Sequence, residues 1–247
     1  DDGDDYVAWC WKAGTTSGIN TTGADITPSA YSFNATSGIS IIKYEGNGTD
    51  GTNTAHALGA VPHMIIVKRL ESANYWAVYH HKSRAAAEDY YLVLNTDAAS
   101  GAAGIWKYTV PTSVYFRHDN STSVNASGED MVAYLFTSIQ GYSKFSSYKG
   151  NSSNDGTFVF TGFRPAYVMI KCSTGGSSSW SIHDSKREGY NVDNDAIYAN
   201  TSAAEGTADD IDILSNGFKL RNTGFTLNQG GDTYVYAAFA EAPFVNS

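Results

Sequence analysis

Short apolar runs, each bounded by Gly, Asn, Ser or Asp, recur along the whole chain at a spacing of roughly ten residues. They are rich in β-branched and aromatic residues, which suit the pleated, half-buried surface of a sheet. This rhythm predicts an all-β fold of antiparallel strands in a sandwich or jelly-roll-like arrangement. Strands are expected at residues 64–70, 75–81, 90–95, 113–118, 131–136, 157–163, 167–172, 180–184, 196–200, 218–222 and 234–239.

Two runs, residues 6–11 and 131–136, are apolar at odd and even positions alike. A strand with two apolar faces must be covered on both, so each is expected at the centre of a sandwich or at a contact between units or chains. For residues 6–11 we favour the contact. Residues 13–37 lack apolar periodicity and are expected to form a connector or long surface loop. Helical potential is confined to two short segments, residues 83–91 and 201–210.

The apolar runs belong to a larger repeat, which decides the domain organisation. Landmarks in the first part of the chain return in the same order 103 to 105 residues later. The pattern predicts one β-sandwich repeat over residues 38–140 and a second over residues 141–247. Residues 1–12 match the last strand of a repeat and are expected to close a preceding unit. The clearest matched pairs are Gly46 with Gly150, Asn47 with Asn151, Gly59 with Gly162, Pro62 with Pro165, Lys68 with Lys171 and Trp76 with Trp180.

Composition excludes several classes of protein. Charged residues make up 17% of the chain and the formal net charge is -9, so the clustered cations of a nucleic-acid-binding surface are missing. No apolar stretch is long enough to span a bilayer, and the first residues do not resemble a signal peptide. Cys10 and Cys172 lie in apolar runs of different units and are expected to be buried free thiols.

The sequence offers no catalytic constellation, and we expect neither an enzyme nor a cofactor. Motifs for a nucleophile elbow, a redox cysteine pair and a phosphate-binding loop are absent from the sequence. The recurring acids at residues 4–5, 129–130 and 232 precede closing strands, where they suit turn geometry. The acidic clusters at residues 193–195 and 209–212 lack the spacing of a calcium loop, so no metal site is predicted. His80 and His81 fall on opposite faces of a strand and cannot chelate one ion together.

Aromatic residues are the best candidates for binding, since a ring face can stack on a sugar with few orientational demands. They make up 13% of the chain, and Tyr75 is a further aromatic expected at a rim. Trp76 and Trp180 recur at matched positions, which favours a core role for that pair because a fold must be duplicated and a site need not be. The candidate ligand-binding residues are Trp76, Tyr79, Trp106 and Trp180.

Several phrases of the sequence, in order, resemble a tandem domain of uncharacterised function common in virion structural and tail-fibre-like proteins of marine tailed bacteriophages. The resemblance covers nearly the whole chain and brings no catalytic residues with it. It implies a structural component of a virion, an extracellular particle, in a tail or fibre appendage that contacts the host. The phrases are YVAWCWKAG, TPSAYSFNATSGISIIKYEGNGT, ALGAVPHMIIVKR, NTDAA, GYSKFSSYKGN, TGFRPAYVMIK, LSNGFKLRN and AAFAEAPF.

Two alternatives remain beside the virion hypothesis. One is a glycan-binding adhesion module outside a virion, and the other is a polysaccharide depolymerase, which would need two carboxyl groups flanking a cleft. Expected partners are other virion proteins and a host surface glycan. By analogy with fibres, the chain is expected to form a homotrimer.

Overall fold

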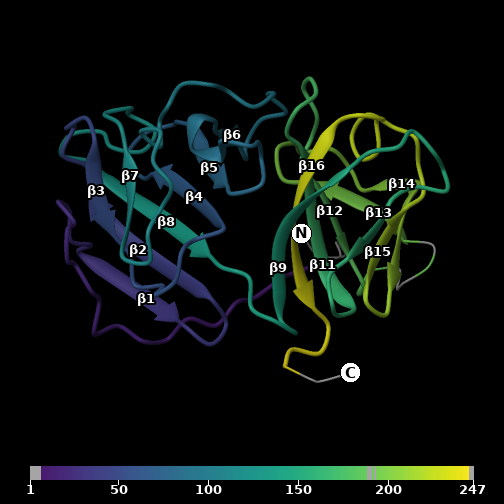
Figure 1. Cartoon of the computed structure of the whole chain (residues 1–247), viewed down its shortest axis with the longest axis horizontal. Coiled ribbons are helices and arrows are strands. Elements are labelled where there is room, and N and C mark those ends of the chain that lie inside the picture. The colour runs from purple at the N-terminus through teal and green to yellow at the C-terminus, as the bar shows by residue number, and fades with distance from the viewer. Residues whose placement is uncertain (1–6, 188–190, 192, 245–247) are drawn as a thin grey trace, which may run out of the picture.

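The structure, a computed structural model, describes residues 7–187, 191 and 193–244. It confirms the all-β fold: antiparallel strands form two large sheets, which lie side by side in Figure 1 with β1–β8 in one half and β9–β16 in the other. The one short helix among these residues, η1 (Ala87–Asp89), is a single 3₁₀ turn. Within the described part of the chain, no helix is long and apolar enough to cross a bilayer.

The first sheet has six strands in the order β1-β2-β8-β4-β5-β6. A two-stranded ribbon, β3-β7, lies beside it in the same half of the molecule (Figure 1). The strands are β1 (Ala30–Asn34), β2 (Ile39–Glu45), β3 (Thr52–Ala55), β4 (Met64–Arg69), β5 (Trp76–His80), β6 (Leu92–Val93), β7 (Tyr115–His118) and β8 (Asp130–Phe136).

The second sheet has eight strands in the order β10-β15-β14-β13-β12-β11-β16-β9. It bends back on itself beyond β13, because residues of β14 and β15 pack in one core with residues of β11 and β16. The strands are β9 (Ser143–Lys149), β10 (Phe158–Phe160), β11 (Pro165–Cys172), β12 (Ser181–Asp184), β13 (Asp193–Tyr198), β14 (Gly206–Leu214), β15 (Gly217–Leu220) and β16 (Thr233–Ala240).

Each sheet buries one face inside its own half. In the first half, Ile65 and Val67 of β4 pack with Phe116 of the ribbon, in what we call the first core. In the second half, Ile170 of β11 packs with Phe218 of β15, in the second core. Alternation along each strand places the neighbouring residues on the opposite face, so every central strand has a second apolar face that needs cover.

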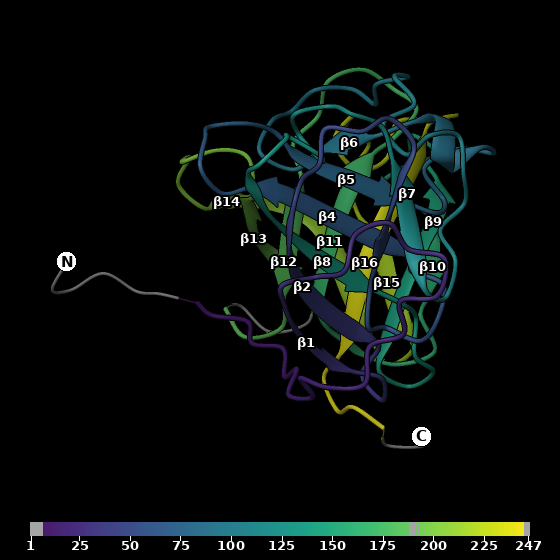
Figure 2. The same cartoon turned by 90° about the vertical axis from the view of Figure 1, so that its left-hand side faces the viewer.

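That cover is the other sheet. The second faces of both sheets meet in a central core, where Met64 and Ile66 of β4 pack with Met169 of β11 and Phe239 of β16. Figure 2 shows the strands of the first sheet crossing in front of those of the second. The two-faced apolar pattern of residues 131–136 is explained by this contact, since β8 lies between the first core and the central core.

The two halves have matching strand orders. The run β2-β8-β4-β5-β6 in the first sheet corresponds, position by position, to β9-β16-β11-β12-β13 in the second, and the pair β3-β7 to β10-β15. Connections along the chain follow the same sequence in both. The division into tandem repeats stays a prediction, and this correspondence supports it.

Some segments differ from the sequence-based expectations. The connector expected at residues 13–37 contains β1, which pairs with β2. The second possible helix, residues 201–210, runs at its end into β14 (Gly206–Leu214), where alternating Ile211 and Ile213 reach the second core. Cys10 and Cys172 are both free, but Cys10 is exposed and Cys172 alone is buried.

The strand expected over residues 1–12 is not seen in its described part. Residues 7–12 form no strand and pair with no other strand. Their tryptophans instead lie edge-on to rings of the second sheet: Trp9 contacts Tyr167 at 5.1 Å and Trp11 contacts Phe239 at 5.1 Å between ring centroids. Aromatic packing against the central core therefore replaces strand pairing here. Residues 1–6, including the acids at residues 4 and 5, lie outside the described residues.

Candidate functional site

Two of the four candidate aromatic residues lie inside the first core. Tyr79 of β5 is 2% exposed and Trp106 is 1% exposed, and their rings meet edge to face at 6.0 Å. A ring enclosed in this way cannot stack on a sugar that arrives from solution. Both residues therefore stabilise the fold, and the structure gives no support to them as ligand contacts.

Trp76 and Trp180 occupy matched places before or at the start of β5 and β12, yet their environments differ. Trp180 is 1% exposed, and its indole Nε1 donates a hydrogen bond to the carbonyl of Val93 at 2.8 Å. Trp76 packs against the central core but stays half-buried. Of the four candidates, Trp76 alone keeps a face near the surface.

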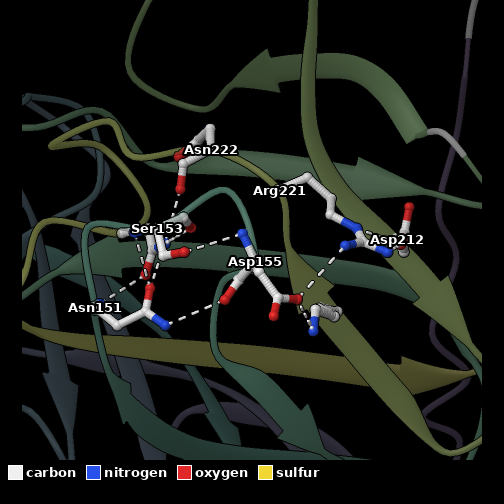
Figure 3. A network of polar contacts seen from close by, with 8 residues as sticks. Asn151, Ser153, Asp155, Asp212, Arg221 and Asn222 are labelled. Atoms are coloured by element: carbon white, nitrogen blue, oxygen red, sulfur yellow. Dashed lines mark hydrogen bonds and ion pairs between the residues drawn. The ribbon is translucent and has the colours of Figure 1, made fainter.

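Two acids of the cluster at residues 209–212 make contacts within the fold. Asp212 pairs with Arg221, and Asp210 accepts a hydrogen bond from the amide of Asn222. Figure 3 shows the pairing of Asp212 with Arg221, which Asp155 also approaches. No group of three metal-ligating side chains occurs among the described residues, and the side chains of residues 193, 194 and 209 lie outside that description.

The acids before the closing strands make ion pairs. Asp130 at the start of β8 lies 2.6 Å from the ammonium of Lys43, and Glu129 pairs with both arms of the Arg69 guanidinium. Each pair joins neighbouring strands of the first sheet at the start of β8. These acids are occupied with cross-strand pairing as well as turn formation.

The best candidate site for ligand contact is a small cleft in the first half. None of the four candidate aromatic residues lines it. Its volume is about 200 Å³, below the roughly 300–1,000 Å³ of sites for drug-sized ligands, so it would accept a single ring-sized group. It combines aromatic rings, hydroxyls and one carboxylate. The cleft is lined by Tyr75, Ala77, Tyr91, Ala103, Ile105, Asp119, Ser121 and Ser123.

The aromatic side of the cleft is held from the ends of two strands. Tyr75 precedes β5 and is 51% exposed, while its backbone N–H donates to the side chain of Asn74 at 2.7 Å. Tyr91 precedes β6 and exchanges two backbone hydrogen bonds of 2.9 Å with Gly101. A side chain at Gly101 would overlap the ring of Tyr91, so glycine permits this close approach. The ring of Tyr75 is thus exposed to solvent, whereas that of Tyr91 is held against Gly101.

The polar side of the cleft begins where β7 ends. Asp119 is anchored by its own N–H, which donates to the carbonyl of Ile105 at 2.9 Å, and one carboxylate oxygen accepts the N–H of Ser121 at 2.8 Å. Burial raises the pKa of the Asp119 carboxyl above its usual range. The hydroxyl of Ser123 is occupied, since it donates to the side chain of Asn74 at 2.9 Å.

This arrangement can bind a polar ring but has no second carboxylate in its lining for glycoside hydrolysis. Tyr75 is identifiable in the sequence as a rim aromatic. Asp119 is not, although the Asp-Asn-Ser order after a strand marks a turn in which the carboxylate binds the backbone two residues on. The meeting of these two segments depends on tertiary structure.

Comparison with known proteins identifies the family but not an activity. A family model described as Domain of unknown function (DUF7483) matches residues 1–243. No curated protein and no solved structure matches the chain.

Proposed function

The chain belongs to the DUF7483 family, and we propose that it is a structural component of a phage virion appendage that contacts the host surface. In this proposal the cleft between Tyr75 and Asp119 binds a sugar of a surface glycan. The sandwich of two sheets serves as the rigid scaffold. The chain acts as a homotrimer in the appendage, beside other virion proteins.

The observation that carries the glycan contact is the exposed ring of Tyr75 facing the same cleft as the Asp119 carboxylate. A sugar presents an apolar face of C–H groups and an edge of hydroxyls. An exposed aromatic ring suits the face, and a carboxylate oxygen accepts hydrogen bonds from the edge. Asp119 is held in place by its hydrogen bonds to Ile105 and Ser121, which limits the entropy lost on binding at the polar side.

The virion part of the proposal is supported by the ordered sequence phrases that resemble phage structural proteins, and the all-β fold is compatible with it. The test is to search purified particles for the polypeptide by mass spectrometry and to locate it with gold-labelled antibody. Detection on an appendage is the expected result. A chain that binds glycan but is absent from particles would favour an adhesion module outside a virion.

The glycan contact is tested separately with the whole chain on an array of bacterial surface polysaccharides. We expect Tyr75→Ala and Asp119→Asn each to weaken binding about tenfold or more, since each removes a group worth roughly 1–2 kcal/mol. Tyr108→Ala is the matched control, because Tyr108 is 65% exposed and is not part of the cleft lining. Binding that survives both cleft variants would place the contact elsewhere, and mass photometry of the same samples tests the trimer.

A further inference from the structure

The central core encloses a cavity of about 360 Å³ between the two sheets. Its walls come from β2, β4 and β8 on one side and from β9, β11 and β16 on the other, including Ile41, Met64, Phe136, Phe145, Met169 and Phe239. Protein interiors normally contain few voids larger than a water molecule. A cavity of this size with apolar walls is therefore unusual for ordinary sheet packing and suits an apolar ligand.

Beside the cavity, the contact between the sheets is closed around Lys171 and Trp180. There Lys171 of β11 is fully buried and donates from Nζ to the carbonyls of Asp97, at 3.1 Å, and Ser178. Trp180 lies beside it, with its ring centroid 5.9 Å from Nζ, and donates to the carbonyl of Val93. A segment of the first half thus covers both the cation and the ring.

The neighbouring rim of the cavity, at Trp76, is more open. Lys68 and Trp76 occupy the corresponding places in β4 and β5 and face each other across the strand pair. Trp76 and the exposed Ala199 line the cavity there, and Trp76 is only half-buried. Lys68 donates to the carbonyl of Ser72 in its own turn, at 3.1 Å, and does not reach across to the second half. Cation and ring remain accessible at this rim.

The face of β4 that lines the cavity continues directly into this cation. Side chains of a strand alternate between faces, so Met64, Ile66 and Lys68 point the same way. The neighbouring cation on β2, Lys43, is engaged with Asp130 at 2.6 Å, whereas Lys68 forms no ion pair among the described residues. The site is thus an apolar chamber with one available positive charge at its edge.

We propose that the chamber binds the hydrocarbon chain of an anionic single-chain amphiphile of the fatty-acid class, with its carboxylate at Lys68. The hydrocarbon chain supplies van der Waals contacts to the cavity walls. The carboxylate head group stays at the open rim, where it pairs with the ammonium of Lys68. Figure 2 shows β4 and β5 of the first sheet crossing in front of β11 and β12 of the second. The hydrocarbon chain of the ligand would enter between these two sheets. This site is separate from the Tyr75–Asp119 cleft and independent of the proposed glycan contact.

Binding is measured by quenching of tryptophan fluorescence with 12-bromododecanoate. Trp11 and Trp76 line the cavity, and the double variant with Trp11→Phe and Trp76→Phe keeps Trp106 in the first core and Trp9 and Trp180 in or against the central core but outside the cavity lining. The expected result is saturable quenching in the whole chain that dodecanoate reverses by competition. Quenching that does not saturate, or that persists unchanged in the double variant, overturns the proposal.

Filling the cavity locates the ligand. Ala237→Phe places a ring in the chamber, and Ala199→Phe narrows the entrance from an exposed position that does not load the core. Both are expected to abolish saturable binding, and the second keeps the test valid if the first fails to fold. Retention of full affinity in Ala199→Phe and in folded Ala237→Phe would place the ligand outside the chamber.

The role of Lys68 is tested with charged and neutral ligands of equal chain length. Lys68→Met should weaken dodecanoate binding about two- to fivefold, the range for an exposed ion pair, and leave 1-dodecanol binding unchanged. Lys144→Met is the control for net charge, since Lys144 lies on the face of β9 opposite the lining residue Phe145. An equal loss for acid and alcohol, or an equal effect of both variants on dodecanoate, contradicts the assignment of the carboxylate.

Discussion

The pair Lys68 and Trp76 in the first sheet and the pair Lys171 and Trp180 in the second stand at the same places in the strand order, yet only the second pair is buried. In both, a side-chain amide accepts the tryptophan N–H of the backbone: Asn95 for Trp76 and Asn200 for Trp180, each at 2.9 Å. The difference lies in what packs across the edge. The local sequence pattern thus determines where the strand forms, and the packing of the other half of the molecule determines whether its residues are buried.

The largest expected difference between the halves is their response to acid. The chain has six histidines, and burial lowers the pKa of each of them, to about 3 for His80. Five lie in the first half, and His183 alone lies in the second. Below pH 6.5 the unfolded chain binds protons that the folded chain excludes, so stability falls with pH down to the folded pKa values.

For His80 alone this linkage amounts to about 3 kcal/mol between pH 7 and pH 4. We therefore expect the first half to lose protection from hydrogen exchange before the second as pH is lowered from 6.5 to 4.5. Exchange measured by mass spectrometry on peptides from each half checks this order. Simultaneous loss of protection in both halves would show that the sheets unfold as one unit.

The second expected difference concerns the matched tryptophans. Trp180→Ala should destabilise the chain by about 3–5 kcal/mol, because it removes a fully buried ring and leaves the Val93 carbonyl without this donor. Trp76→Ala should cost about 1–2 kcal/mol, since the ring is half-buried at a cavity. Urea unfolding of both variants gives the comparison, and equal costs would contradict the difference in burial between the two tryptophans.

The aromatic residues also show which features of the fold could be predicted from the sequence. Strands such as β4, β8, β11 and β16 could be predicted because their β-branched and aromatic runs are bounded by turn residues. The burial of Tyr79 on β5 and of Trp106 in a turn could not, since the sequence around an aromatic residue does not show whether its ring meets a core or solvent. Nor could the cleft, because Tyr75 and Asp119 are brought together by packing between distant segments.

Weakly apolar or polar strands give no such signal in the sequence, for a related reason. Residues 52–55 of β3 read Thr-Asn-Thr-Ala, and their pairing with β7 is a tertiary choice that their composition does not announce. The first residues of the chain give the opposite error. Their apolar run resembles a closing strand, yet residues 7–12 lie against rings of the second sheet without strand pairing.

One feature is the same in both halves and predicts equal effects. Asn125 and Asn228 are fully buried, and each accepts one backbone N–H: that of Asn47 at 2.8 Å and that of Asn151 at 3.0 Å. Their amides donate back to the side-chain oxygen of the same residues, at 3.0 Å in both cases. We call each of these two contact regions, Asn47 with Asn125 and Asn151 with Asn228, a corner. Figure 3 shows the surroundings of Asn151 in the second one.

Replacing either buried amide leaves several polar groups without partners. Asn125→Ala and Asn228→Ala should each cost about 1–3 kcal/mol, measured as the shift in the free energy of unfolding in urea. The control is Asn74→Ala in the more exposed loop before β5, for which a smaller loss is expected. A large inequality between the two corner variants would weaken the case that the halves share one design.

The smallest expected effects come from two tyrosine hydroxyls that close the same corners. Tyr44 of β2 donates to the carbonyl of Val124 at 2.6 Å, and Tyr148 of β9 donates to that of Leu227 at 2.7 Å. Burial raises the pKa of both well above the usual range, so each hydroxyl remains a donor at neutral and moderately alkaline pH. Tyr44→Phe and Tyr148→Phe should each lower the free energy of unfolding by about 1 kcal/mol. Tyr31→Phe, from the partly exposed strand β1, is the control. Matched losses in the two halves, with a smaller loss in the control, would mean that the turns around Asn125 and Asn228 are held in the same way although the Lys–Trp pairs differ in burial. A loss confined to one half would mean that the two turns are not equivalent.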